Sequence, residues 1–234
     1  MKALSSMTVK IEYFTDVLCV WAYFAQIRMD ELKTEFSDHV DIEYRFIPIF
    51  GAAKSSIEKN WKEQGGVAGF NRKLQSMAKD WPHITLSPDL WTSVAPESSI
   101  SPHLYLKAIQ LLTAGERSAR ESLDNATWEN AIWMFRKAFF CDARDISNRH
   151  VQDDIALSLG LSVTAIHALI DNGKAYAVLE SDRLAAEEYK VPGSPTLVLN
   201  EGRQLLYGNV GYHIIEANVR ELLANPDHGE AAWC

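Results

Sequence analysis

Hydrophobic and polar residues alternate with a period of two in several short segments of the chain. The alternation is clear over residues 9–13 and again over residues 42–46. This period predicts strands that each present one apolar face. Near the C-terminus, residues 197–199 and 205–207 flank a turn at 200–202 and predict a β-hairpin.

Apolar residues at helical spacing separate the first two predicted strands. Val20, Phe24, Ile27 and Leu32 predict a helix over about residues 20–36. A strand, a helix and a second strand joined by short connections form a βαβ unit. We therefore expect the two strands to be parallel, with a right-handed crossover.

The period of two disappears between Gly51 and about Gly173, where the pattern becomes helical. Helices are predicted over about residues 55–63, 68–80, 102–114, 119–140, 149–159 and 163–171, and further helices at 176–189 and 212–224. This order predicts an α/β protein with a thioredoxin-like fold and a large all-helical insertion. Residues 8–50 and 176–225 are expected to form the thioredoxin-like domain, 51–175 the helical insertion domain and 226–234 a C-terminal tail.

Composition limits the classes of function. The 234 residues carry a net charge of −8, which argues against nucleic acid or an anionic membrane as a partner, because both need a basic surface. No apolar run is long enough to span a membrane, and the N-terminus lacks the apolar region of a signal peptide. Three cysteines are too few for a disulfide framework. We therefore expect a cytoplasmic protein with reduced thiols.

Cys19 lies where the first predicted strand gives way to the first helix. A helix start presents unpaired N–H groups and the positive end of the macrodipole, and both favour a thiolate. We therefore predict that Cys19 is reactive and that its pKa is depressed, although the nearby Asp16 opposes ionisation. The alternative is a packed cysteine that behaves as a small hydrophobic residue.

Three segments resemble the DsbA-like superfamily. Residues 16–22 (DVLCVWA) resemble its active-site entry. Residues 135–147 (FRKAFFCDARDIS) resemble the insertion segment of the 2-hydroxychromene-2-carboxylate isomerases and FrnE-like proteins, to which kappa-class glutathione transferases are related. Residues 191–196 (VPGSPT) resemble the loop that carries a cis-proline opposite the active-site residue. The resemblance covers about residues 8–225 and implies a cis Ser194–Pro195 bond near the Cys19 sulfur.

The chain departs from these relatives in ways that affect its chemistry. DsbA-like oxidoreductases carry a Cys-x-x-Cys pair, whereas here Ala22 replaces the resolving cysteine and Val20 replaces the usual proline. The isomerases and kappa transferases typically carry serine at the position of Cys19 and use glutathione as coenzyme. Their Ser-Asp-Arg-like cluster holds the glutamyl group of glutathione, but residues 207–213 contain neither an acid nor an arginine.

The leading hypothesis is a thiol–disulfide oxidoreductase that acts through a single cysteine, by monothiol exchange. Its partner would be a thiol or disulfide substrate or glutathione, with no tightly bound cofactor and no metal, because the histidines show no ligand spacing. The alternative is a glutathione-dependent isomerase or transferase that acts on a small hydrophobic substrate. A third class is a non-catalytic binding module that keeps the fold.

The candidate site residues follow from these hypotheses. Cys19 is the catalytic residue, and Val20, Trp21, Ser194 and Pro195 are the substrate-binding residues. Cys234 is the candidate resolving thiol, within one subunit or across a homodimer, because a lone thiol cannot release a mixed disulfide by internal attack. Cys141 follows Phe139-Phe140 and is expected to be packed.

Overall fold

The computed structural model describes residues 8–115 and 121–225. Within these ranges a 4-stranded mixed sheet has the order β2-β1-β3-β4. Its strands are β1 (Val9–Thr15), β2 (Val40–Phe46), β3 (Thr196–Leu199) and β4 (Gln204–Tyr207). β2 runs parallel to β1, and β3 runs antiparallel to both β1 and β4. The strands, the parallel βαβ unit and the hairpin were all predicted from the sequence and are confirmed.

The helix predicted over residues 20–36 is divided in the structure. α1 (Val20–Phe24) and α2 (Gln26–Glu35) are separated by Ala25, whose ψ is −9°. The Ala25 carbonyl accepts from Arg28 N–H at 3.0 Å and from Met29 N–H at 3.4 Å, so the hydrogen-bond ladder tightens there toward the i→i+3 pattern of a 3₁₀ turn. α1 is therefore only 5 residues long.

The remaining helices agree with the predicted positions to within a few residues. They are α3 (Ala53–Asn60), η1 (Lys62–Gln64), α4 (Gly66–Ala78), α5 (Ile100–Gly115), α6 (Glu121–Phe140), α7 (Arg149–Ser158), α8 (Val163–Asp171), α9 (Lys174–Glu188) and α10 (Tyr212–Ala224). Between residues 60 and 170, the only β-structure in the described part of the chain is an isolated bridge between Leu90 and Val94. The predicted all-helical character of this region is confirmed there.

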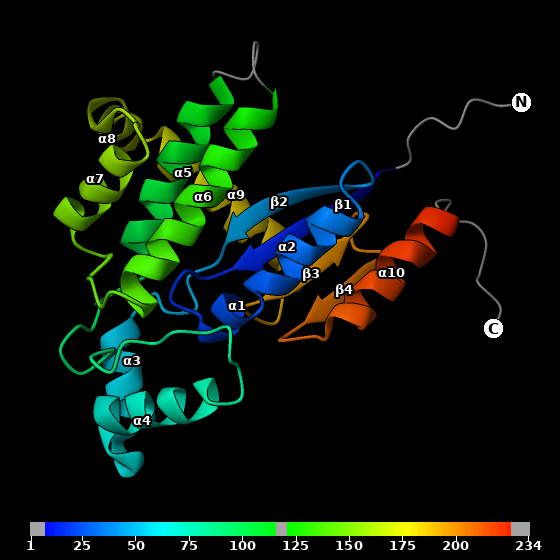
Figure 1. The fold of residues 1–234 in the computed structure, drawn as a ribbon. Coiled ribbons are helices and arrows are strands. Elements are labelled where there is room, and N and C mark those ends of the chain that lie inside the picture. Colours follow the sequence, from blue (N-terminus) through cyan, green and yellow to red (C-terminus); the bar gives the residue numbers. More distant parts are fainter. Residues whose placement is uncertain (1–7, 116–120, 226–234) are drawn as a thin grey trace, which may run out of the picture.

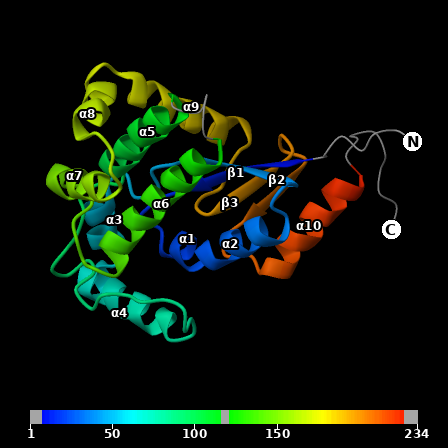
Figure 2. The same cartoon turned by 45° about the horizontal axis from the view of Figure 1, so that its top comes forward.

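The helices surround the sheet on three sides. α2 and α10 lie on one face of the sheet, and α9 lies on the other (Figure 1). Helices α3 to α8 are here called the helical block; α5 and α6 lie near β2, and α3 and α4 lie beyond the ends to which β1 and β2 point (Figure 2). No helix in the described ranges is long and apolar enough to cross a membrane. The alternation along β1 explains the layering, because Val9, Ile11 and Tyr13 are buried in the main core while Phe14 belongs to a smaller cluster against α9.

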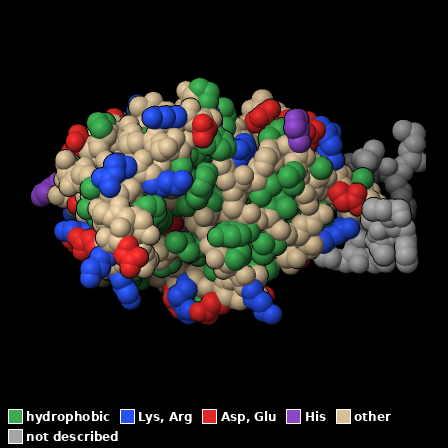
Figure 3. All heavy atoms as spheres, turned by 90° about the horizontal axis from the view of Figure 1, so that it is seen from below, with side chains coloured by type: hydrophobic (Ala, Val, Ile, Leu, Met, Phe, Trp, Pro, Cys, Tyr) green, Lys and Arg blue, Asp and Glu red, His purple; other side chains and the backbone are tan. Residues whose placement is uncertain are grey.

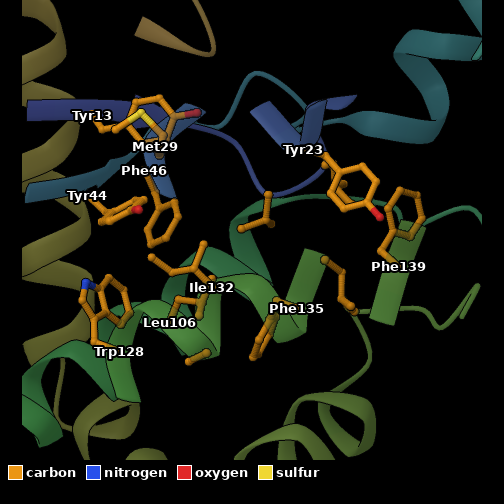
Figure 4. Packing of buried hydrophobic residues seen from close by; sticks show 14 of the residues in the cluster. Tyr13, Tyr23, Met29, Tyr44, Phe46, Leu106, Trp128, Ile132, Phe135 and Phe139 are labelled. Carbon is orange, nitrogen blue, oxygen red and sulfur yellow. The ribbon is translucent and has the colours of Figure 1, made fainter. Parts of the chain in front are cut away.

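Aromatic side chains join the sheet to the helical block. Side chains of the strands and of helices α5 and α6 meet in one cluster, which includes Tyr13, Tyr44, Phe46, Leu106, Trp128 and Ile132 (Figure 4). Tyr13 packs edge-to-face on Tyr44, with ring centroids 5.5 Å apart. Because burial of such rings dominates core energetics, the sheet and the helical block share one continuous core.

A buried ion pair closes the edge of the sheet at β2. Lys107 Nζ of α5 lies 2.7 Å from Asp182 Oδ2 of α9, and both side chains are 1% exposed. Lys107 also donates a hydrogen bond to Tyr44 O (3.1 Å), and Asp182 accepts one from Phe46 N–H (2.7 Å). Desolvation lowers the pKa of Lys107 and raises the pKa of Asp182, although the opposite charge of the partner offsets part of each change. The pair thus satisfies backbone groups at the β2 edge and docks α5 and α9 there.

Candidate functional site

Cys19 lies between the C-terminal end of β1 and the start of α1. It is the N-cap residue of α1 and has extended backbone angles, with φ −78° and ψ 113°. The residue is only 5% exposed. Its sulfur lies 3.3 Å from the Ser194 carbonyl oxygen, to which the thiol donates a hydrogen bond. The structure therefore brings Cys19 and Ser194, two of the predicted site residues, into direct contact.

The predicted loop geometry around Ser194 is confirmed. The Ser194–Pro195 peptide bond is cis. Ser194 Oγ accepts a hydrogen bond from Asp16 N–H at 2.9 Å. The serine therefore contacts the Cys19 turn twice, through its carbonyl oxygen to the thiol and through its hydroxyl to the backbone.

The Asp16 carboxylate organises the turn that precedes Cys19. Its side chain is buried and accepts three hydrogen bonds, from Leu18 N–H (2.8 Å), Phe50 N–H (2.8 Å) and Ser99 Oγ–H (2.7 Å). The Asp16 carbonyl oxygen accepts a further bond from Cys19 N–H at 3.0 Å. These three donors hold the Asp16 carboxylate beside the thiol, and His103 Nε2 lies 3.5 Å from its Oδ1.

The predicted depression of the Cys19 pKa is wrong. Burial raises the pKa of the Cys19 thiol above its ordinary value of 9.0, because the thiolate loses its hydration, and the negative charge of Asp16 raises it further. Hydrogen bonds from Ser194 and from the N–H groups of Trp21 and Ala22 oppose this rise without overcoming it. The helix start acts in the direction expected from the sequence. Its effect is limited by burial, which the sequence did not show.

The other predicted substrate-binding residues differ in accessibility. Val20 is buried, whereas Trp21 is 39% exposed and packs edge-to-face on Phe24 at 5.7 Å. Pro195 lines a small cavity beside Tyr13 and Gly208. Figure 3 views the molecule from below, the side on which α1 and α4 lie in Figure 1, and hydrophobic side chains reach the surface in the middle of this face. Trp21 is therefore the predicted residue best placed to touch a partner.

Several exposed apolar residues lie at the end of the sheet that carries Cys19. Ile49 follows β2, Ile100 begins α5 and Tyr207 ends β4, and all are exposed. The Tyr207 ring lies against Gly193 of the cis-proline loop, so a Cβ at Gly193 would come 3.1 Å from it. None of these residues was predicted as a site residue, because isolated apolar residues in loops carry no distinctive sequence signal.

An arginine that the sequence analysis missed reaches the segment after β4. Arg28 of α2 donates hydrogen bonds to Asn209 Oδ1 and, at 2.9 Å, to Val210 O. Its guanidinium also lies over the Trp81 ring, 5.1 Å from the centroid. The segment 207–213 itself lacks an arginine, so only the fold supplies this cation.

The other two cysteines of the chain are Cys141 and Cys234. Cys141 is partly buried, and its sulfur lies 3.0 Å from the Tyr23 hydroxyl and 3.4 Å from Thr85 O. Cys234, the predicted resolving thiol, lies outside the described residues. Residues 8–115 and 121–225 contain no group of three or more His, Cys, Asp or Glu side chains that could hold a metal ion.

The family follows from a comparison with known domains. A profile of the DSBA-like thioredoxin domain matches residues 10–220. The chain belongs to this family. The match confirms the resemblance inferred from the sequence and the thioredoxin-like fold. No protein with a curated description matches the sequence.

Solved structures of DsbA-like proteins share the fold over most of their length. A probable DsbA oxidoreductase from Streptomyces coelicolor is 17% identical, with a TM-score of 0.71 over 95% of this chain and 93% of that chain. A 2-hydroxychromene-2-carboxylate isomerase is 18% identical, with a TM-score of 0.60 over 95% and 100%. The cytosolic disulfide reductase DsbM from Pseudomonas aeruginosa, solved with GSH, is 17% identical, with a TM-score of 0.59 over 90% and 99%. At these identities the likeness shows the fold alone.

Proposed function

We propose that this DSBA-like protein reduces disulfide bonds by monothiol exchange through Cys19. The observation that carries the proposal is the contact between the Cys19 thiol and the carbonyl of Ser194 in the cis-proline loop, with Ala22 in place of a second thiol. The apolar residues around this end of the sheet, Trp21 and Tyr207 among them, would receive the substrate.

The exchange requires a second thiol from outside the site. The Cys19 sulfur attacks one sulfur of a substrate disulfide, a new Cys19–substrate disulfide forms, and the other substrate sulfur leaves and takes a proton. Glutathione then attacks the mixed disulfide, and a second glutathione completes the reduction, so that two glutathione molecules become one glutathione disulfide. The solved relative DsbM with GSH supports glutathione in this role. A reducing cytoplasm would maintain the supply of this thiol.

The raised pKa of Cys19 favours reduction over oxidation of substrates. Strong disulfide oxidants depend on a stabilised thiolate, which makes their own cysteine a good leaving group. Cys19 has the opposite character, because burial and Asp16 disfavour its thiolate. The Cys19 sulfur would therefore be a poor leaving group, and we expect its release from the mixed disulfide by the second glutathione to be the slow step of the cycle.

The test measures reduction of a peptide–glutathione mixed disulfide, coupled to glutathione reductase and NADPH. We expect turnover that depends on added glutathione and is lost in Cys19→Ser but kept in Cys141→Ser. Ala22→Cys is the matched control, because a second thiol one helical turn away should release the substrate once without glutathione and leave a disulfide between positions 19 and 22, which mass spectrometry detects. Full activity in Cys19→Ser would overturn the proposal.

Cys234 would replace glutathione as the thiol that attacks the mixed disulfide at Cys19. Mapping of disulfides by mass spectrometry after mild peroxide tests this role. A Cys19–Cys234 peptide, absent in Cys234→Ser, would support it, within one subunit or across a homodimer. Cys19 trapped only as a sulfenic acid or an external adduct would exclude it.

One observation favours the glutathione-dependent isomerase or transferase as a second candidate. A thiol that remains protonated can donate a hydrogen bond to the sulfur of bound glutathione instead of attacking a disulfide, and Cys19 has a raised pKa and already donates such a bond to Ser194. Calorimetry separates the candidates. Glutathione binding that persists in Cys19→Ser would support this second function, since a serine hydroxyl can donate the same bond.

A further inference from the structure

Two side chains at the start of α5 form hydrogen bonds to the turn that carries Cys19. Ser99 and His103 are both buried and lie one helical turn apart, with His103 N–H bonded to Ser99 O at 3.1 Å. Ser99 donates to the Asp16 carboxylate at 2.7 Å. His103 Nε2 accepts a hydrogen bond from Val17 N–H at 3.1 Å. The helical block therefore holds the backbone of the Cys19 turn directly.

The bond to Val17 defines the protonation of the His103 ring. Because Nε2 accepts a hydrogen bond, it presents a lone pair, and the ring proton lies on Nδ1, a buried nitrogen that has no hydrogen-bond partner among the described residues. Nε2 also lies 3.5 Å from Asp16 Oδ1. This contact joins two acceptors and is not an ion pair, since the Nε2 lone pair already serves Val17. The ring stacks on Phe46, with centroids 4.8 Å apart at 14°, which fixes its plane.

His103 accepts a hydrogen bond that the other residues around this turn do not accept. Asp16 N–H is bonded to Ser194 Oγ, Leu18 N–H to Asp16 Oδ1 and Cys19 N–H to Asp16 O. Val17 N–H is bonded to His103 alone among the hydrogen bonds of the described residues. If this acceptor is lost, a buried backbone donor remains unsatisfied and the turn must shift to reach water.

We propose that His103 is a positioning residue that fixes the Val17 peptide and thereby holds the Cys19 sulfur against the Ser194 carbonyl. Its importance for turnover rests on the proposed function, but its effect on Cys19 does not. The His103 ring acts through its lone pair, and neither its charge nor its volume is required. A substitution that restores an acceptor should therefore preserve the site, whereas one that only fills the space should not.

The test compares His103→Phe with His103→Gln. Phenylalanine keeps a planar ring for the stacking on Phe46 and fills the space but accepts no hydrogen bond, whereas the glutamine carbonyl can accept from Val17 N–H. Iodoacetamide labelling of the Cys19 peptide is followed by mass spectrometry across a pH series, so that Cys141 and Cys234 do not interfere. We expect His103→Phe to lower the pH midpoint of labelling and raise its rate at neutral pH severalfold, and His103→Gln to stay close to the wild type. Identical behaviour of the two variants, or a wild-type profile in His103→Phe, would overturn the proposal.

If His103→Phe does not fold, a measurement on the wild-type protein tests which nitrogen of His103 carries the proton. In the ¹⁵N-histidine NMR spectrum, the His103 signal is assigned by its loss in His103→Gln. We expect the pattern of a neutral ring protonated at Nδ1, and a ring protonated at Nε2 or at both nitrogens at neutral pH would refute the assignment. Labelling needs no disulfide substrate, so a failure of the peptide-reduction assay leaves this inference standing. Normal reduction of the peptide with unaltered labelling in His103→Phe would refute the inference alone.

Discussion

Removal of one member of the buried pair at the β2 edge should destabilise the protein strongly. In Lys107→Met the Asp182 carboxylate remains buried and keeps only Phe46 N–H at 2.7 Å and Arg45 at 3.4 Å. A buried charge whose partner is removed typically costs about 3–5 kcal/mol. Unfolding entropy is about 2.1 cal/mol/K per residue, so for 234 residues this predicts a fall in Tm of roughly 6–10 °C.

The double variant should recover much of this loss. Asp182→Asn keeps a carbonyl oxygen for Phe46 N–H but leaves the Lys107 ammonium with the neutral acceptors Tyr44 O and Gln110 Oε1. When both changes are combined, no buried charge of this pair remains. Since desolvation already disfavours both charges in the native protein, Lys107→Met/Asp182→Asn should be no less stable than either single variant.

A double-mutant cycle measured by urea and thermal denaturation provides the assay. The free energies of unfolding of the wild type, the two single variants and the double variant give the coupling energy. We expect the coupling to exceed about 2 kcal/mol, as for buried residues in direct contact. Additive single effects, or a loss below about 1 kcal/mol in Lys107→Met, would refute the view that this pair is a buried charge pair that docks α5 and α9.

Further predictions concern the Cys19 site. Asp16→Asn should lower the pKa of Cys19 and speed its alkylation at neutral pH, because a negative neighbour is removed; an unchanged pH profile would contradict this. The raised pKa of Cys19 contributes stability that is present below pH 9.0 and lost as the pH rises through the folded pKa, so the wild type should lose stability relative to Cys19→Ser in alkaline urea titrations. Thr15→Val removes one acceptor of buried Arg136, 2.7 Å away, and leaves Gln26 Oε1 as its other side-chain acceptor; it should lower the free energy of unfolding by about 1–3 kcal/mol, and a change within error in urea titrations would oppose it.

Position along the chain explains why some site residues could be predicted. Cys19 and the 191–196 loop are marked by local sequence, a strand-to-helix boundary and a distinctive run of prolines and glycine. His103 and Arg28 carry no such mark, because each lies within a helix and acts on a segment far away in the chain, at Val17 and Val210. Their roles depend on how the helices pack, which no local pattern encodes.

The sequence by itself determined the strands, most of the helices and the placement of a cysteine at a helix start, because periodicity and turn residues act over a few positions. Only the tertiary structure decided the acidity of that cysteine. Its pKa is governed by burial, by the Asp16 carboxylate and by the Ser194 loop, and solvent exclusion is a property of the whole packed core. The local helix start favours the thiolate, but the surrounding fold removes the water that a thiolate needs.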